Sequence, residues 1–342
     1  MNVLESATLS ASKGFHMSEL IIKPETAPGL PGTQFILPEV FARSGKRATY
    51  RFVEFFAAEI RNINTRLAYY RALTKFFDWL EEFYPGLEID QINSIVVARY
   101  IELHPGSPLT KNQHLSAIRS LFRWLLSGGV VRENPAAEVR GVRHRVKIGK
   151  TPILSDEEMM QLLDSIDISH VVGRRDRALI ATMFYSFARI GAVLKMDRKD
   201  LFNKGKRTWF RLHEKGGKYH EVPVHHKAEE YLDAYLEAAG FGEEKDIPLF
   251  QTSPGRGKKL TGKRLQRQEA WAMVKRRAMA AGISTNVCNH SFRAIGITNF
   301  LRNGGSRDNA QRVAAHEDVR TTALYDRRDE TISLDEIERI RL

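Results

Sequence analysis

Six side chains in the second half of the chain could together act on a phosphate ester. They are Arg189, Lys215, His290, Arg293, His316 and Tyr325. A phosphodiester already carries negative charge, and attack on phosphorus concentrates more of it on the equatorial oxygens. Two guanidiniums can hold those oxygens with paired hydrogen bonds while staying protonated at any working pH. We therefore assign Arg189 and Arg293 to such a clamp, with His316 as an additional donor.

Tyr325 is the candidate nucleophile. A phenol has an ordinary pKa of about 10, so it attacks slowly at neutral pH unless a base or nearby positive charge assists it. A preorganised donor that binds charge in the transition state contributes about 2.7–4 kcal/mol. The arginines and the tyrosine therefore suit transfer of a phosphate from a phosphodiester to the protein.

Each of these signals is weak when taken alone. In 342 residues with 11 histidines, chance supplies about one His-x-x-Arg, the pattern of His290 and Arg293. Arg189 could simply pair with Asp197 or Asp200. The order of the residues is more specific. Arg189 follows a buried helix, Lys215 lies at a hairpin turn, His290 and Arg293 open one helix, and His316 precedes a helix carrying Tyr325.

Four segments carry this order: ARIGAVLKMD, HEKGGKYHEVPV, NHSFRAIGITNFLRNGG and AAHEDVRTTALYDRR. Together they resemble the catalytic domain of the tyrosine recombinases, the phage-integrase family, over about residues 155–328. The helical region 46–139 looks like that family's core-type DNA-binding domain. The family often has an acid where this chain has Ala192, and often a glycine where it has Ala315.

The resemblance implies a role for the remaining residues. His290 would assist Tyr325 as the base, and Lys215 would protonate the leaving 5′ oxygen, with Lys218 as its nearest rival. The product would be a 3′-phosphotyrosyl bond that keeps the bond energy, so that rejoining needs no ATP, metal or other cofactor. The partners implied are double-stranded DNA and three further subunits in a homotetrameric synaptic complex. The free protein would be a monomer or dimer, with an accessory DNA-bending protein as a further partner.

The elements that must position these residues are mostly helical. Apolar residues recur at helical spacing along 46–139 and again at 227–239, 264–281, 290–303, 307–315 and 319–328. Between them, residues 208–213 and 219–224 alternate around a Lys-Gly-Gly-Lys turn, which predicts a β-hairpin. The expected fold is mainly α with a small β-sheet, and the resemblance implies a C-shaped clamp around DNA.

Composition and pattern divide the chain into five parts. We expect a flexible arm at 1–45, a helical DNA-binding domain at 46–139, a basic linker at 140–151 and a catalytic domain at 152–330. The tail 331–342 carries apolar residues on one helical stripe, and we expect it to pack on a neighbouring subunit.

The formal charge of +12 favours a polyanionic partner. Basic residues gather in four places: on the first helices, in the linker, on the hairpin, and in the loop that leads to residue 264. The DNA-binding candidates are Arg66, Arg71, Lys111, Arg119, Arg140, Arg143, Arg145, Lys147, Lys218, Lys258, Lys259, Lys263 and Arg264. No apolar run reaches the roughly 18 residues of a membrane span, and the start lacks a secretory pattern. We expect a protein of the bacterial cytoplasm, associated with the nucleoid.

Rival functions remain at this point. A type IB topoisomerase shares the tyrosine chemistry, and a DNA-binding regulator could derive from a recombinase that lost activity. Four histidines near the hairpin (His213, His220, His225 and His226) fit no metal-site spacing, so a metallonuclease is the weakest rival. Among the recombinases, we favour an integrase from a mobile element.

Overall fold

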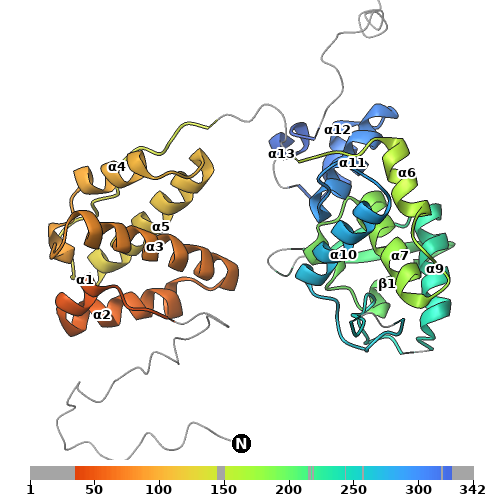
Figure 1. The fold of residues 1–342 in the computed structure, drawn as a ribbon, viewed down its shortest axis with the longest axis horizontal. Helices are drawn as coiled ribbons and strands as arrows, with labels where there is room; N and C mark the ends of the chain where they lie inside the picture. The colour runs from red at the N-terminus through yellow and green to blue at the C-terminus, as the bar shows by residue number, and fades with distance from the viewer. Residues whose placement is uncertain are drawn as a thin grey trace, which may run out of the picture. The chain divides into compact units, whose positions relative to one another are not determined.

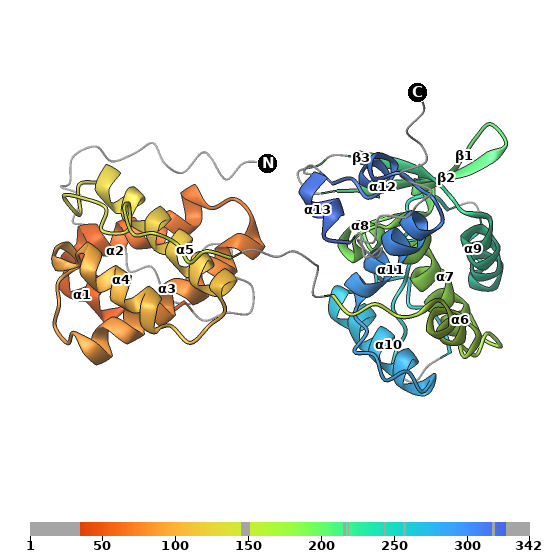
Figure 2. The same ribbon diagram turned by 90° about the horizontal axis from the view of Figure 1, so that it is seen from above.

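The computed structural model describes residues 35–144, 151–214, 217, 219–242, 244–255, 258–316 and 319–325. The chain divides into two compact units with the boundary between residues 145 and 146, inside the predicted linker. Most of the described residues are helical, and three short strands form one antiparallel sheet (Figures 1 and 2). The expected fold class, mainly α with a small sheet, is confirmed.

The N-terminal unit is a cluster of helices. Its elements are α1 (Glu39–Arg43), α2 (Gly45–Glu54), a π-helical turn (Phe55–Glu59), α3 (Ile63–Phe83), a 3-10 turn (Ile89–Gln91), α4 (Ser94–Leu103) and α5 (Pro108–Ser127). The side chain of Asn62 caps α3 by accepting hydrogen bonds from two backbone amides. The side chain of Ser107 caps α5 by accepting one hydrogen bond, from the amide of Thr110, and Pro108 follows at the first helical position.

The predicted flexible arm extends too far toward the helices. Residues 39–43 form α1, and Phe35, Val40 and Phe41 are buried in the core of the N-terminal unit. The ring of Phe41 packs 4.3 Å from that of Phe52, measured between centroids. Aromatic burial therefore orders these residues although five helical residues are too few to show a period. The rest of the predicted arm, 1–34, lies outside the described residues.

The C-terminal unit is built around one central helix, α7 (Val171–Ser186), with other helices and a small sheet packed about it. Its elements are α6 (Asp156–Asp164), α7 (Val171–Ser186), α8 (Ile190–Val193), a 3-10 turn (Arg198–Asp200), β1 (Leu201–Lys204), β2 (Arg207–His213), β3 (Tyr219–Pro223), α9 (His226–Ala239), α10 (Arg267–Ala280), α11 (Asn289–Arg302), α12 (Arg307–Val313) and α13 (Val319–Ala323). Helix α7 packs against both α9 and α11, and its residues contribute to the main core of the unit (Figure 1).

The sheet has the strand order β1-β2-β3 with antiparallel pairing. Strands β2 and β3 are the predicted hairpin, and Phe210 pairs with Val222 in its middle. Both of these side chains are buried, so the alternating pattern places one face of the hairpin against the core. Strand β1 was not predicted from the sequence.

Candidate active site

Helix α11 carries two of the predicted catalytic residues and is held tightly against α7. Arg293 is 1% exposed; it donates to the carbonyl of Phe187 through one terminal nitrogen and, at 2.6 Å, to that of Ala314 through the other. Phe187 ends α7 in the left-handed region, with φ of 54°. The helices can meet here because residue 296 is glycine: a Cβ would lie 2.2 Å from the carbonyl oxygen of Phe184. Backbone geometry thus fixes the guanidinium.

Tyr325 lies directly against the same helix. Its phenol oxygen is 2.6 Å from Nε2 of His290, and its carbonyl accepts a 2.9 Å hydrogen bond from the hydroxyl of Thr298. The sequence predicted a helix through Tyr325, but α13 ends at Ala323 and Tyr325 follows in a turn. The two contacts with α11 explain this difference, because they hold both ends of the residue in one place.

His316 packs on the tyrosine from another side. The two rings are nearly parallel, at 9°, with centroids 5.7 Å apart. Nδ1 of His316 is 2.8 Å from the hydroxyl of Thr322, so the hydroxyl can donate to Nδ1 and leave Nε2 as the protonated nitrogen. This tautomer suits the predicted role of a hydrogen-bond donor.

Burial, assisted by the cations of the site, lowers the pKa of both histidines and keeps them neutral at neutral pH. Burial lowers the pKa of His316 to about 3, with the charges of Arg293 and Arg189 acting in the same direction. The pKa of His290 is also lowered, first by partial removal from water and then by Arg293, Arg189 and Arg267. A neutral His290 beside a phenol can accept its proton.

Burial and Arg189 also lower the pKa of Arg293, to about 10, while Tyr325 and Glu214 oppose the shift. The guanidinium therefore remains charged at neutral pH. Its Nε is buried and has no hydrogen-bond partner among the described residues. Such a donor is costly unless an acceptor arrives, and a phosphate oxygen is a suitable one.

Arg189 stands at the start of α8 with its side chain 44% exposed. It pairs with Glu214 at 2.8 Å rather than with Asp197 or Asp200. Glu214 directly precedes Lys215 in the sequence, so the hairpin is anchored at Arg189. Lys215 itself and its rival Lys218 lie outside the described residues, and their roles remain predictions.

An open pocket extends from these residues over α10. Arg189 and His290 line it together with Arg267 and Trp271, whose indole is about half exposed. No role was assigned to Arg267, Trp271 or Glu214 from the sequence. Only Glu214 had a usable signal, as the neighbour of Lys215 in the hairpin motif.

The DNA-binding candidates of the N-terminal unit fall into two groups. Arg71, Arg140 and Arg143 are exposed. The other three donate to backbone carbonyls of their own unit: Arg66 to Ile60, Lys111 to Glu102, and Arg119 to Ala136 and Val139. Arg119 therefore holds the segment after α5, and the phosphate contact predicted for it stays a prediction.

The predicted linker is anchored at its start. Val142 exchanges hydrogen bonds of 2.8 and 2.9 Å with the side chain of Asn112 on α5. Residues 140–142 therefore belong to the N-terminal unit rather than to a free connection. Arg145 and Lys147 lie outside the described residues.

In the C-terminal unit, Lys258, Lys259 and Lys263 are exposed. Arg264, unlike these lysines, is partly buried and bonded within its own unit. It donates to the carbonyls of Leu194 and Met196 at 2.7 and 3.0 Å and pairs with Asp197. Arg264 thus has a structural role at the end of α8, and the phosphate contact predicted for it stays a prediction.

Three of the four histidines of the hairpin region contact different residues, and the fourth, His226, packs on His225 with ring centroids 4.2 Å apart. Nε2 of His213 is 2.8 Å from Asp200, and that of His220 is 3.0 Å from the carbonyl of Val313. His225 stacks on Tyr185 at 4.1 Å. Within the described part of the chain, no three His, Cys, Asp or Glu side chains form a group that could hold a metal ion. None of its helices is long and apolar enough to cross a membrane.

Two family models match the chain. The model for the phage integrase family matches residues 152–331, and that for the phage integrase N-terminal SAM-like domain matches 51–129. Among curated proteins, the tyrosine recombinase XerD of Ralstonia nicotianae is 28% identical over 77% of this chain and 83% of its own. XerC of Xanthomonas campestris is 27% identical over 88% and 92%.

Solved structures share the fold at low identity. The XerH recombinase bound to its difH substrate aligns with a TM-score of 0.63 and 19% identity, covering 92% of each chain. A lambda integrase dimer bound to a core site aligns with a TM-score of 0.62 and 17% identity, covering 87% of this chain and 80% of that one.

Proposed function

Since the chain belongs to the phage integrase family, we propose that it recombines DNA by forming a covalent bond between Tyr325 and a 3′ phosphate. The family and its XerC and XerD relatives identify a tyrosine recombinase, an enzyme that cleaves and rejoins DNA. The assignment of Tyr325, the covalent intermediate and the biological outcome are our proposals.

One observation supports the assignment of Tyr325 more than any other. Its phenol oxygen lies 2.6 Å from a histidine nitrogen, beside a buried arginine whose Nε has no hydrogen-bond partner in the described part of the chain. A nucleophile within hydrogen-bond reach of a base is the arrangement that covalent catalysis requires. A tyrosine kept only for packing needs neither partner.

The reaction follows from these contacts. The phenol passes its proton to Nε2 of His290 while its oxygen attacks the phosphorus, and the bond to the 5′ oxygen breaks. Arg189, Arg293 and His316 donate hydrogen bonds to the phosphate oxygens, and Lys215 supplies the proton that the leaving 5′ oxygen takes. The reverse sequence joins a 5′ hydroxyl from another strand, so the number of phosphodiester bonds is conserved without ATP.

The assembly is a separate part of the proposal. Lambda integrase has been solved as a dimer on a core site and as a tetramer on a Holliday junction. We propose that this chain also acts as a tetramer, on two sites, and that both of its units bind the duplex DNA. Residues 331–342 would join neighbouring subunits, and a variant that lacks them should lose synapsis on a native gel. Unchanged synapsis and activity would contradict this role.

An integrase role in a mobile element, with an accessory DNA-bending protein, is the most specific part. The fold shared with lambda integrase supports it. Fragments that flank the gene should then contain paired sites that the purified protein recombines, and the yield should rise when a DNA-bending protein is added.

The deciding experiment is a covalent trap. A DNA fragment that the protein binds is nicked near each candidate cleavage position, so that the cut strand diffuses away and rejoining fails. The parent should give a slow DNA–protein band on a denaturing gel, and Tyr325→Phe should give none while binding the DNA equally well. Tyr219→Phe, an exposed tyrosine on β3, is the control and should retain the band.

The other outcomes identify the rivals. Binding without a covalent band at any nick position would indicate a regulator. A band accompanied by relaxation of supercoiled plasmid, without exchange between two sites, would indicate a type IB topoisomerase.

A further inference from the structure

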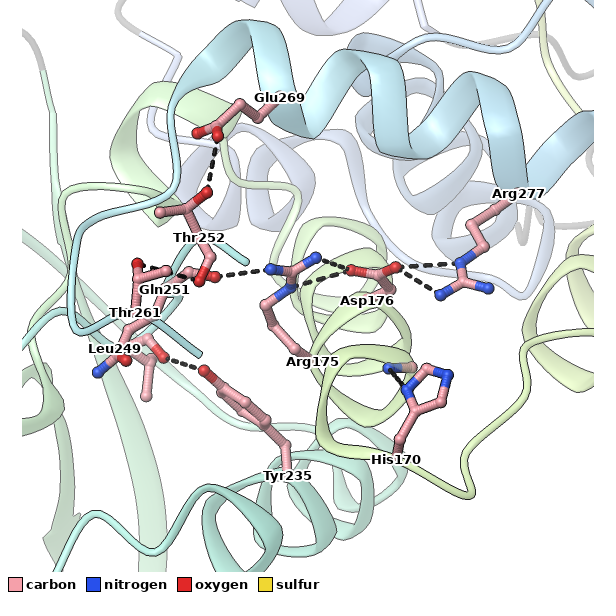
Figure 3. Close-up of polar contacts among 11 residues, drawn as sticks. His170, Arg175, Asp176, Tyr235, Leu249, Gln251, Thr252, Thr261, Glu269 and Arg277 are labelled. Atoms are coloured by element: carbon pink, nitrogen blue, oxygen red, sulfur yellow. Dashed lines mark hydrogen bonds and ion pairs between the residues drawn. The ribbon is translucent and has the colours of Figure 1, made fainter. Parts of the chain in front are cut away.

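A buried carboxylate joins two arginines on different helices of the C-terminal unit (Figure 3). Asp176 on α7 is fully buried and accepts four hydrogen bonds. One oxygen binds Nε and a terminal nitrogen of Arg175 at 3.0 and 2.6 Å. The other binds the same two kinds of atom of Arg277, on α10, at 3.0 and 2.7 Å. The carboxylate therefore orients both guanidiniums.

Burying this group of charges has a large desolvation cost if its only role is to hold two helices together. Three charges leave water, and apolar side chains of similar size often stabilise a fold as well or better. Two positive charges against one negative leave an excess of one. Ionic groups in such places are best explained where their geometry fixes something else.

The geometry here fixes the start of a loop. The remaining terminal nitrogen of Arg175 donates a 2.7 Å hydrogen bond to the carbonyl of Gln251. The side-chain oxygen of Gln251 in turn accepts the amide of Gly262 at 3.0 Å. One residue at the entry of the loop is thus bound to Arg175 through its backbone and to the exit of the loop through its side chain.

Backbone bonds close the same loop. The amide of Thr252 donates to the carbonyl of Lys263 at 2.8 Å, and the amide of Thr261 donates back to Thr252 at 3.1 Å. The hydroxyl of Thr252 reaches Glu269 in the first turn of α10 at 2.7 Å (Figure 3). We call Gln251, Thr252, Thr261 and Gly262 the loop base.

Exposed cations lie in and beside the loop that the loop base closes. Lys258 and Lys259 belong to the closed segment, and Lys263 directly follows Gly262. We call these three residues the loop lysines, and each is exposed. Arg267 follows only four residues after Lys263 and lines the pocket that contains Arg189 and His290. The loop base is therefore joined to the pocket through the first turn of α10.

We propose that Arg175, oriented by Asp176, is a positioning residue that fixes the loop base so that the loop lysines bind phosphates of the DNA next to the cleavage site. This inference rests on the proposed function, because it takes DNA as the substrate. It adds a residue that touches neither DNA nor the reacting atoms. Arg175 acts through the carbonyl of Gln251, and Asp176 acts through Arg175.

Two matched variants separate positioning from stability. Arg175→Lys keeps a positive charge opposite Asp176 but cannot also reach the carbonyl of Gln251. Arg277→Lys keeps the charge on the other side, and Arg277 makes no contact with the loop base that the structure shows. Both variants remove hydrogen bonds from the same buried carboxylate, that of Asp176. Only the first should alter DNA binding.

The readout is the salt dependence of binding to duplex DNA, measured in a Tyr325→Phe background well below the melting temperature. Each phosphate contact contributes about 0.9 to the slope of log K against log salt. Replacing the loop lysines with alanine should lower the slope by up to about 2.7. Arg175→Lys should lower the slope by the equivalent of about one to three phosphate contacts, and Arg277→Lys should leave it unchanged. In a variant that already lacks the loop lysines, Arg175→Lys should lower the slope no further.

A second pair guards against misfolding. Thr252→Val removes the hydroxyl that binds Glu269 at nearly constant volume, and Thr252→Ser retains it. Thr252→Val should lower the slope and Thr252→Ser should not. Equal slopes for Arg175→Lys, Arg277→Lys and the parent, or equal slopes within the Thr252 pair, would overturn the inference.

The background variant separates this test from that of the proposed chemistry. Binding by Tyr325→Phe protein does not depend on whether Tyr325 forms a covalent bond, so a failed covalent trap leaves this test intact. A parent protein that binds no duplex DNA would overturn the proposed function first, and the inference with it.

Discussion

The phenol oxygen of Tyr325 and Nε2 of His290 lie 2.6 Å apart, although 35 residues separate them in the sequence. The proposed nucleophile and the proposed base are therefore held together by tertiary structure before DNA binds. His290 stands two residues into α11, and Thr298 on the same helix holds the backbone of Tyr325. One helix thus sets both partners of the proton transfer.

The pH dependence of cleavage should reflect the lowered pKa of His290. The base must be neutral, so cleavage is lost as pH falls through its pKa. Because that pKa lies below the ordinary 6.5, the acid limb of the second-order rate constant should have its midpoint below pH 6.5. Cleavage of nicked DNA by limiting protein, measured from pH 4.5 to 8, tests this.

His290→Ala should reduce the rate by about 10²–10⁴-fold and remove the limb. His226→Gln, at an exposed histidine of α9, should change neither. A midpoint above pH 6.5 in the parent would argue against His290 as the base.

The stability of the C-terminal unit should depend on His316 in the acid range. Its pKa is about 3 in the folded protein against about 6.5 when unfolded, so the unfolded chain binds the extra proton first. The free energy of unfolding should therefore fall as pH is lowered from about 6.5 toward 3. Urea unfolding at several pH values measures it. His316→Gln should flatten this dependence, and an unchanged profile in that variant would contradict the assignment.

Arg293→Lys should greatly reduce the cleavage rate, although the substitution retains the positive charge. A lysine has one nitrogen, so it cannot bind the carbonyls of Phe187 and Ala314 and still offer donors to a phosphate. Loss of one preorganised donor corresponds to about 10²–10³-fold in cleavage rate. Single-turnover cleavage at saturating protein measures it. Arg302→Lys, at the exposed end of the same helix, should keep the parent rate.

Gly296→Ala should destabilise the C-terminal unit. The new methyl would lie 2.2 Å from the carbonyl oxygen of Phe184 and 2.7 Å from the ring of Phe187, so α11 and α7 must separate. Overpacking of this kind costs about 1–3 kcal/mol. Urea unfolding measures it, with Gly191→Ala on α8 as the control, because its methyl would meet nothing within 4 Å. Equal losses in the two variants would refute the close approach.

The sequence predicted the elements that have a strong local signal. The hairpin of β2 and β3 alternates regularly, and the two arginines, two histidines and tyrosine of the site stand in segments with a recognisable order. Strand β1 has only four residues, of which Asn203 and Lys204 are exposed, so no alternation marks it. Length and burial decided which elements were visible.

Long-range contacts account for the rest. Tyr325 leaves its helix because α11 binds it at both ends, and nothing near it in the sequence shows this. Arg264 sits in a basic run that reads as a phosphate-binding stretch, yet carbonyls about 70 residues away take its guanidinium. Arg175 and Asp176 lie inside a helix that predicts only burial, and their partners come from α10 and the loop.

Ala315→Gly should stabilise the protein, because Ala315 has a left-handed backbone with φ of 48°. It follows the end of α12, where its amide binds the carbonyl of Arg312 and the next amide, that of His316, binds the carbonyl of Gln311. These two hydrogen bonds form a helix C-terminal motif that favours glycine at position 315. A non-glycine residue in the left-handed conformation costs roughly 1–2 kcal/mol. Glycine gives back part of that through the greater freedom of the unfolded chain.

We expect a net gain of up to about 1 kcal/mol, or roughly 2–4 °C in melting temperature for a unit of this size. Thermal unfolding at neutral pH measures it, with Ala314→Gly as the matched control. Ala314 is buried in a right-handed helical conformation, so glycine there should lower the melting temperature. If both variants melt below the parent, the conformation at 315 carries no strain. A stabilised variant that cleaves at the parent rate would also show that the residue before His316 affects folding rather than the chemistry.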